Sequence, residues 1–325
     1  MKRFALRLMR DLGAFAFSRR ISAGLARILM YHNFSEVCET GSDAVNVSAL
    51  RDQLTYLRDH FHVVPLSYIV ECLTTSRNLD NFAVALTIDD GRRNFYQCFF
   101  PLLTEFAMPA TFFVVSSFIR GEEWVWTDKV LWLSEQPAAL DELRGTEIER
   151  LFRKLNDMRP EVRNSKIAAM AARMGVGIPL ETPERYGPCS WAELREMADS
   201  GLIEIGSHTA THPILASITD AESWHELTLS RAQIEEGIGR QVKSFCFPNG
   251  KPGDYRSTQI QQIVDAGYTS AVLASPGLIE TGTSAFELPR IGVSGRLDAL
   301  SFQKSVDGAE YYHGRLKRTL GMGHA

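Results

Sequence analysis

Short apolar runs recur along the chain, separated by stretches in which apolar residues have helical spacing. Most of the runs do not alternate apolar with polar residues, as is typical of strands buried on both faces of a parallel sheet. The expected strands are RILMYH (27–32), HVVPL (62–66), FAVALTID (82–89), ATFFVV (110–115), LIEIGS (202–207), SFCFP (244–248), YTSAVLA (268–274) and LPRIGV (288–293). The expected helices lie near 48–60, 66–74, 92–107, 191–199, 221–239, 255–266 and 297–312, with Ser48 as a helix N-cap. This order predicts an α/β fold with a closed or incomplete (β/α) barrel.

The strand–helix rhythm stops between about residues 120 and 190, where charged helical segments occur without a strand pattern. We interpret this stretch as a helical insertion on one βα loop. The chain of 325 residues is long enough for one large α/β domain. The predicted organisation is an N-terminal segment (1–26), a barrel (27–312) that carries the insertion, and a C-terminal tail (313–325).

The composition limits which partners the protein can bind and which compartment it suits. The formal net charge of −4 argues against a general nucleic-acid binder, because such proteins usually carry a basic surface. The 5 cysteines are scattered and show no CxxC spacing. This usage suits a reducing compartment and gives no sign of a cysteine-based zinc site.

The N-terminal segment differs from the rest of the chain because it is basic. Its only acid is Asp11, and its cations are Lys2, Arg3, Arg7, Arg10, Arg19 and Arg20. Arginines interrupt the apolar stretch, so we expect neither a cleavable signal peptide nor a membrane span. Residues 1–20 either lie as a helix on an anionic membrane or pack on the protein's own surface. We expect a cytoplasmic protein, peripheral at the inner face of the membrane; the alternative is an exported enzyme with an uncleaved N-terminal anchor.

Two adjacent carboxylates end one of the expected strands, in LTIDDG (86–91). The chain turns at the C-terminal edge of a strand, so Asp89 and Asp90 can both reach one cleft, and active sites of barrels lie at that edge. The same letters suit a turn in which an aspartate caps the next helix. Taken alone, the motif leaves both interpretations open.

A pair of histidines follows another expected strand, in SHTATHP (207–213). His208 and His212 share a face if this stretch makes a helical turn, as in zinc motifs with histidines four positions apart. The alternative is one surface histidine and one buried, hydrogen-bonded histidine. Two imidazoles and a carboxylate form a ligand set suited to zinc and neighbouring first-row metals, with a position left open.

The two motifs support each other because each directly follows a strand, and parallel strands bring such loops to one rim. A third loop in the same phase, CFPNGKPGDY (246–255), holds Pro248 and Asn249 in a tight turn. Such a turn can direct a backbone N–H into the cleft as a donor to an oxyanion. The sequence thus predicts one active site built from three loops.

The order TIDDG, SHTATH, FPNG and LPRIGV resembles the polysaccharide deacetylase family, also called the NodB homology domain or carbohydrate esterase family 4, over roughly residues 27–295. LMYH, at residues 29–32, is most similar to the exopolysaccharide (poly-N-acetylglucosamine) deacetylase subgroup. The resemblance implies a distorted (β/α) barrel of about seven or eight strands. It also implies a hydrolase that removes N-acetyl groups from N-acetylhexosamines with a divalent metal. Zinc is expected first, with Co²⁺, Ni²⁺ or Mn²⁺ as alternatives.

Carried over residue by residue, the resemblance makes Asp90, His208 and His212 the metal ligands. Asp89 becomes the general base, because one carboxylate can hold the metal while its neighbour takes a proton from the attacking water. Arg290, in LPRI, resembles the arginine that pairs with the base and keeps it ionised. The alternative for Arg290 is an ordinary surface arginine.

The general acid is where the sequence departs from the family's pattern. Many members carry a C-terminal Leu-x-His motif, which is not visible between residue 270 and His313. His32 becomes the candidate acid, or else a residue that orients the substrate or Asp89. A backbone N–H near Pro248 and Asn249 would bind the oxyanion. Trp126, in EEWVWTDKVLW (122–132), either stacks on a sugar ring or closes a small core.

The predicted partner is an N-acetylated saccharide or a lipid- or nucleotide-linked glycan precursor, without nucleic acid. Two alternatives keep the fold. One is a deformylase or cyclic-amide hydrolase, and the other is a catalytically inactive domain that binds glycan or serves as a scaffold. The presence of all four residues Asp89, Asp90, His208 and His212 argues against the inactive domain, because binding alone gives no reason to keep both carboxylates.

Overall fold

The computed structural model describes residues 2–37, 43–309 and 311. Its main sheet is parallel, in the order β10–β1–β5–β6–β7–β8–β9, and β4 (His62–Val63) pairs with the start of β5. The strands on this path are β1 (Arg27–Tyr31), β5 (Ala83–Ile88), β6 (Ala110–Val114), β7 (Ile203–Ser207), β8 (Ser244–Cys246), β9 (Ser270–Val272) and β10 (Ile291–Gly292). β10 pairs with β1, and a parallel bridge joins Val272 to Leu288, so the sheet curls until its two ends meet. The predicted distorted (β/α) barrel is confirmed.

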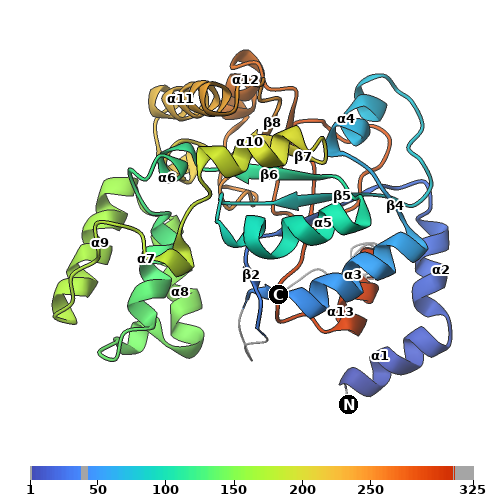
Figure 1. Cartoon of the computed structure of the whole chain (residues 1–325), viewed down its shortest axis with the longest axis horizontal. Helices are drawn as coiled ribbons and strands as arrows, with labels where there is room; N and C mark the ends of the chain where they lie inside the picture. Colours follow the sequence, from blue (N-terminus) through green and yellow to red (C-terminus); the bar gives the residue numbers. More distant parts are fainter. Residues whose placement is uncertain (1, 38–42, 310, 312–325) are drawn as a thin grey trace.

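The alternation of side chains along β5 explains where the site forms. Leu86 and Ile88 pack in the layer beneath the outer helices, whereas Ala83 and Ala85 belong to a separate cluster drawn from strands all around the barrel. Successive strand residues point to opposite faces, so the inward direction continues to Asp89. Helices cover the outside of the sheet (Figure 1): α3 (Val47–His60), α4 (Leu66–Thr74), α5 (Phe100–Phe106), α10 (Trp191–Asp199), α11 (Asp220–Ile238) and α12 (Ser257–Asp265).

Between β6 and β7 the chain forms a group of helices that projects to one side of the barrel (Figure 1). This group contains α6 (Ser116–Ile119), α7 (Trp126–Ser134), α8 (Gly145–Asn156) and α9 (Pro160–Arg173). Leu133, Leu155 and Ile167 belong to a cluster of buried apolar residues of its own, separate from the clusters around the sheet. The predicted domain boundaries stay a prediction, and the predicted C-terminal tail lies outside the described residues.

The N-terminal residues form α1 (Lys2–Asp11) and α2 (Ala14–Ile21), which lie beside α3 and α13 (Ala299–Val306), far from α8 and α9 in Figure 1. α2 is anchored by the buried ring of Phe15 and by Arg19, whose guanidinium contacts the Asp307 carboxylate at 2.8 Å. Arg3 pairs with Asp298 at the start of α13. Within the described residues, none of the helices combines the length and the apolar character needed to cross a bilayer.

Several predicted boundaries were wrong for local reasons. The N-cap of α3 is Asn46, whose side chain accepts a hydrogen bond from the Ala49 amide, so the helix begins before Ser48. β4 is shorter than predicted because Pro65, which has no N–H, starts α4. α13 ends at Val306 because Gly308 adopts a left-handed conformation, with a φ of 80°. The predicted helix at 92–107 begins with a π-helical turn at Phe95–Phe99. A small parallel pair, β2 (Phe34–Ser35) and β3 (Val45–Asn46), was not predicted.

Candidate active site

The loops that follow β1, β5, β7 and β8 meet at one rim of the barrel and enclose a cavity of about 620 Å³. Residues 126–156 of the helical insertion form part of its wall. The predicted site residues that line this cavity are His32, Asp89, Asp90, Trp126, His208, His212, Asn249 and Arg290. A cavity of this volume is in the usual range for small-ligand sites.

Asp90, His208 and His212 direct one ligand atom each toward a common point. The Oδ1 atom of Asp90 lies 3.6 Å from Nε2 of His208 and 3.7 Å from Nε2 of His212, and the two Nε2 atoms are 3.2 Å apart. Ligands bound at ~2.1 Å in a tetrahedral zinc site are about 3.4 Å from one another. The three residues therefore have the spacing and the chemistry to hold a divalent cation, and all three are buried.

Both imidazoles are in the protonation state that metal binding requires. Nδ1 of His208 lies 2.7 Å from the backbone oxygen of Cys246. A carbonyl only accepts, so Nδ1 carries the proton and the lone pair of Nε2 is left for a metal. Burial lowers the pKa of His208, and burial together with the neighbouring His208 lowers the pKa of His212 to about 3. Both rings are therefore neutral at pH 7, as a metal ligand must be.

Backbone strain is concentrated at the same place. Of the non-glycine residues with positive φ, Asp90 (81°), Thr209 (69°), His212 (59°) and Asn249 (59°) lie in the three predicted loops. A left-handed conformation costs about 1–2 kcal/mol for such residues and persists where the surroundings fix it. Contacts such as the 2.9 Å bond from the His212 amide to Oγ1 of Thr209 hold the histidine loop in this form.

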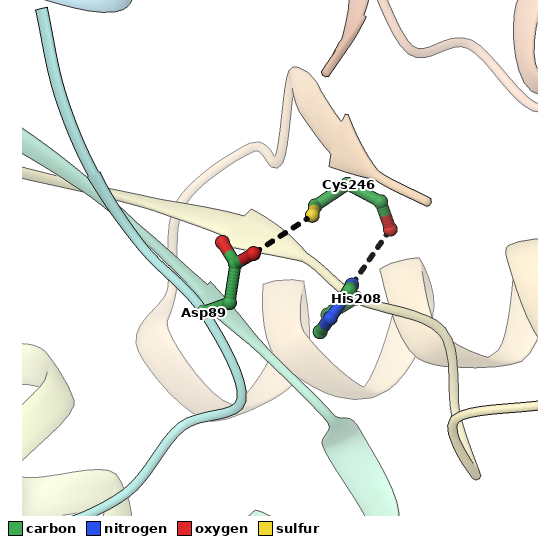
Figure 2. Close-up of side chains that lie close together, drawn as sticks. All are labelled: Asp89, His208 and Cys246. Atoms are coloured by element: carbon green, nitrogen blue, oxygen red, sulfur yellow. Dashed lines mark hydrogen bonds between the residues drawn. The ribbon is translucent and has the colours of Figure 1, made fainter. Parts of the chain in front are cut away.

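A second group of potential ligands, Asp89, His208 and Cys246, lies beside the first. Figure 2 shows the Cys246 sulfur directed at Asp89 and its carbonyl oxygen directed at His208. Burial raises the pKa of the Cys246 thiol well above its ordinary value, so Sγ is protonated and donates to Oδ2 of Asp89 across 3.5 Å. Metals bind the thiolate. The group of Asp90, His208 and His212 therefore fits a cation better.

Asp89 is held by an arginine. Nη1 and Nη2 of Arg290 each donate to one carboxylate oxygen of Asp89 at 2.7 Å, and both side chains are almost fully buried. Nε of Arg290 donates to the backbone oxygen of Leu273 at 2.8 Å, which fixes the guanidinium. Burial by itself raises the pKa of Asp89, but the charge and hydrogen bonds of Arg290 outweigh burial, and the net pKa is lowered. Asp89 is therefore ionised at neutral pH.

The remaining predicted site residues are His32, Pro248, Asn249 and Trp126. Nε2 of His32 lies 3.6 Å from Oδ2 of Asp89, and its side chain is 43% exposed at the cavity. Asn249 lies in the turn after β8, where Nδ2 donates to Asp254 at 2.6 Å; Pro248 precedes it. Trp126 is only 3% exposed, and the guanidinium of Arg163 lies 4.5 Å from the centre of its ring. This position leaves little of the indole face for a sugar ring, so Trp126 acts mainly as part of the insertion's core.

Arg92 and Asp128 also belong to the site, although neither was predicted from the sequence. Nη1 of Arg92 contacts Oδ2 of Asp90 at 2.6 Å, and its Nε and Nη2 donate to the two carboxylate oxygens of Asp128 at 3.0 and 2.6 Å. The only sequence signal was a pair of arginines directly after the carboxylates, in DDGRR. Nothing in the sequence indicated Asp128, which lies in the first turn of α7.

A model of the family described as polysaccharide deacetylase matches residues 76–271, which is more than half of the chain. The matched span contains both carboxylates and both histidines of the candidate site. The chain belongs to the polysaccharide deacetylase family. The family predicted from the order of the motifs is thus confirmed.

Among curated proteins, this chain is similar to poly-beta-1,6-N-acetyl-D-glucosamine N-deacetylase of Escherichia coli (strain K12), with 34% identity over 93 residues. That stretch is 28% of the present chain but only 14% of the relative, so the chain corresponds to a small part of that protein. The predicted resemblance to the exopolysaccharide subgroup is confirmed by this relative.

Solved structures share the fold of this member of the family. The Streptococcus pyogenes deacetylase PplD in complex with acetate superposes with a TM-score of 0.60 at 16% identity, covering 87% of this chain and 98% of that one. IcaB from Ammonifex degensii also gives a TM-score of 0.60, at 18% identity, covering 88% and 97%. At these identities the similarity establishes the fold.

Proposed function

We propose that this polysaccharide deacetylase is a divalent-metal-dependent hydrolase that removes N-acetyl groups from N-acetylhexosamine units of a glycan or of a lipid- or nucleotide-linked glycan precursor. One observation carries the proposal. In a single cavity, Asp90 joins His208 and His212 as a cation-binding set, while both carboxylate oxygens of the neighbouring Asp89 are bound by Arg290. A carboxylate that is buried, ionised and not needed as a ligand is suited to accept a proton.

A divalent cation held by Asp90, His208 and His212 would supply a Lewis acid that polarises the acetamide carbonyl and activates a water molecule. We propose zinc, because two imidazoles and one carboxylate suit it, with Co²⁺, Ni²⁺ or Mn²⁺ as alternatives. Asp89 takes the proton from the attacking water. Arg290 keeps Asp89 ionised and in place.

Two further groups complete the proposed chemistry. A backbone N–H in the turn at Pro248 and Asn249 donates to the oxyanion that forms on the acetamide carbon. This turn is fixed because Oδ2 of Asp254 accepts from both Nδ2 of Asn249 and the Lys251 amide. His32 donates the proton that the departing amine needs, since it lines the cavity on the exposed side of Asp89.

The experiment that tests the proposed function measures both acetate and formate. Zinc-loaded protein is incubated with oligomers of N-acetylglucosamine, a nucleotide-linked N-acetylhexosamine, a lipid-linked N-acetylhexosamine, their N-formyl analogues and small cyclic amides. We expect acetate release from at least one N-acetylated saccharide. Release of formate alone, or opening of a cyclic amide, would favour the alternative hydrolases. Saccharide binding with no product would identify an inactive binding domain.

We also propose that the protein works at the cytoplasmic face of an anionic membrane, with the N-terminal helices as the contact. Phe4 and Leu8 on α1 and Leu12 in the turn after it are spaced four residues apart, and all three are exposed, as are Phe17 and Ile21 on α2. Cations lie on the same two helices, and Arg7 and Arg20 are exposed. An exposed apolar stripe beside arginines is typical of a helix that lies on anionic lipid. The cysteines of the described residues are free thiols, in keeping with a reducing compartment.

Replacing Leu8 and Leu12 together with glutamate should lower binding to vesicles that contain anionic phosphatidylglycerol by at least about tenfold, because each leucine contributes about 1.5–3 kcal/mol when its side chain leaves water. Flotation of the full-length protein with vesicles measures this. The matched control is Val264→Glu, which changes a residue of comparable exposure on α12. Equal flotation of the double variant and the control, or no flotation of the natural protein, would refute the membrane contact.

A further inference from the structure

A chain of alternating charges connects the cation-binding set to the helical insertion. Asp90 contacts Arg92, and Arg92 contacts Asp128 through two donors. The exposed fractions of the three side chains are 7%, 5% and 0%. Charges buried this deeply are costly to keep unless each is paired. The three residues therefore act as one unit.

The two oxygens of Asp90 have different duties. Oδ1 faces Nε2 of both histidines, whereas Oδ2 is bound by Nη1 of Arg92. Arg92 thus fixes the rotation of the carboxylate and directs its other oxygen at the cation. The backbone of Asp90 is also held in a left-handed conformation that is uncommon for residues other than glycine, with a φ of 81°.

Arg92 also brings a positive charge next to the place where a cation would bind. By itself this charge would repel the cation and compete with it for Asp90. Asp128 accepts the other two donors of Arg92 and balances the charge. Asp128 lies in the first turn of α7, where the helix dipole adds support for a carboxylate.

The same loop is attached to the far end of the insertion. The Arg93 amide donates to the backbone oxygen of Gly187 at 2.9 Å, and the Cys189 amide donates to the backbone oxygen of Gly91 at 3.0 Å. The segment directly after Asp90 therefore contacts the insertion at two places. The Arg92 side chain contacts α7, and the backbone of the segment contacts the stretch just before α10.

We propose that Arg92 and Asp128 are positioning residues for the cation: Arg92 orients Asp90, and Asp128 neutralises Arg92 so that the site keeps its affinity. Asp128 acts only through Arg92. This inference rests on the metal site of the proposed function. It adds that cation binding and the position of α7 are coupled, so that an occupied site holds the insertion against the barrel.

The test measures zinc affinity by competition with a chelator on metal-stripped, full-length protein. Asp128→Asn should weaken zinc binding by about 10–100-fold, the usual effect of losing a partner of a metal ligand. Arg92→Lys should weaken it similarly, because one ammonium keeps the charge but cannot bridge two carboxylates as a guanidinium does. In an Arg92→Gln background, Asp128→Asn should change the affinity by less than about twofold, since the residue through which it acts is gone.

The matched control is Asp307→Asn, which breaks a partly buried arginine–aspartate pair, with Arg19, outside the site. It should lower thermal stability and leave zinc affinity unchanged. Hydrogen exchange gives a second readout: zinc should slow exchange in α7 of the natural protein and have less effect in Asp128→Asn.

The outcomes separate the inference from the proposed function. Absence of zinc binding by the natural protein would refute both. Tight binding by the natural protein, with Asp128→Asn indistinguishable from Asp307→Asn, would overturn the inference and leave the proposed function intact. An equal loss from Asp128→Asn with and without Arg92 would also overturn it. If Asp128→Asn does not fold, the test uses Arg92→Lys instead. Zinc affinity of Arg92→Lys equal to that of the natural protein would then refute the inference.

Discussion

Replacing Asp90 with asparagine should remove the bound cation and abolish measurable deacetylation. Asparagine has nearly the same shape but no charge, so a buried dication would face two neutral imidazoles, a neutral amide and the guanidinium of Arg92. A metal contributes several kcal/mol to stabilising the transition state, so we expect acetate release to fall by at least about a thousandfold. Metal content by mass spectrometry and acetate release should decline together.

The control for this variant is Asp199→Asn, which removes one charge from a surface pair with Arg240. It should keep both metal and activity. Acetate release by Asp90→Asn protein that contains no metal would contradict the proposed mechanism. Full metal content in the same variant would contradict the ligand set.

Replacing Asp89 with asparagine should separate the two effects, because the metal should stay bound while activity falls. The expected fall is about 10²–10⁴-fold, the usual contribution of a general base. The pH profile follows from the lowered pKa of Asp89. The active form is the carboxylate, so activity in the natural protein is lost only as the pH falls through a pKa below the ordinary aspartate value. In Arg290→Gln, the largest influence opposing burial is lost and the pKa of Asp89 rises, so the acidic limb of kcat/KM should move to higher pH.

A second variant and the assay temperature make this prediction specific. His32→Gln should lower kcat/KM and move the acidic limb upward by less than Arg290→Gln does, because Arg290 contributes more than His32 to lowering the pKa of Asp89. Breaking that buried pair costs about 3–5 kcal/mol of folding stability, so Arg290→Gln is assayed below its measured unfolding temperature. An acidic limb that stays at the same pH in Arg290→Gln would refute the assignment of Asp89 as the base.

The parts of the site that the sequence predicts are those encoded by neighbours in the chain. LTIDDG places two carboxylates at the end of a buried strand, and SHTATHP places two imidazoles at the end of another. The parallel order of β5, β6 and β7 then brings both loops to one rim, as the strand–helix alternation requires. Arg290 could be assigned only through the family resemblance, because nothing adjacent to it indicates its partner.

The parts that the sequence does not predict depend on contacts between distant residues. Asp128 becomes a partner of Arg92 only because the insertion folds back on the barrel, and its neighbours resemble an ordinary amphipathic helix. The sequence leaves two roles open for Trp126, a sugar contact or a small core, and the packing of Arg163 and Phe152 near its ring favours the core. Helix ends were misplaced where a single residue, such as Asn46 or Gly308, decides the boundary.

The attachment of the insertion at both of its ends has a consequence for how such a protein can diversify. The block between α7 and Gly187 can vary in length or sequence without displacing the loop that carries Asp89 and Asp90. Exchange of that block as a unit would reshape one wall of the cavity while leaving Asp89 and Asp90 in place.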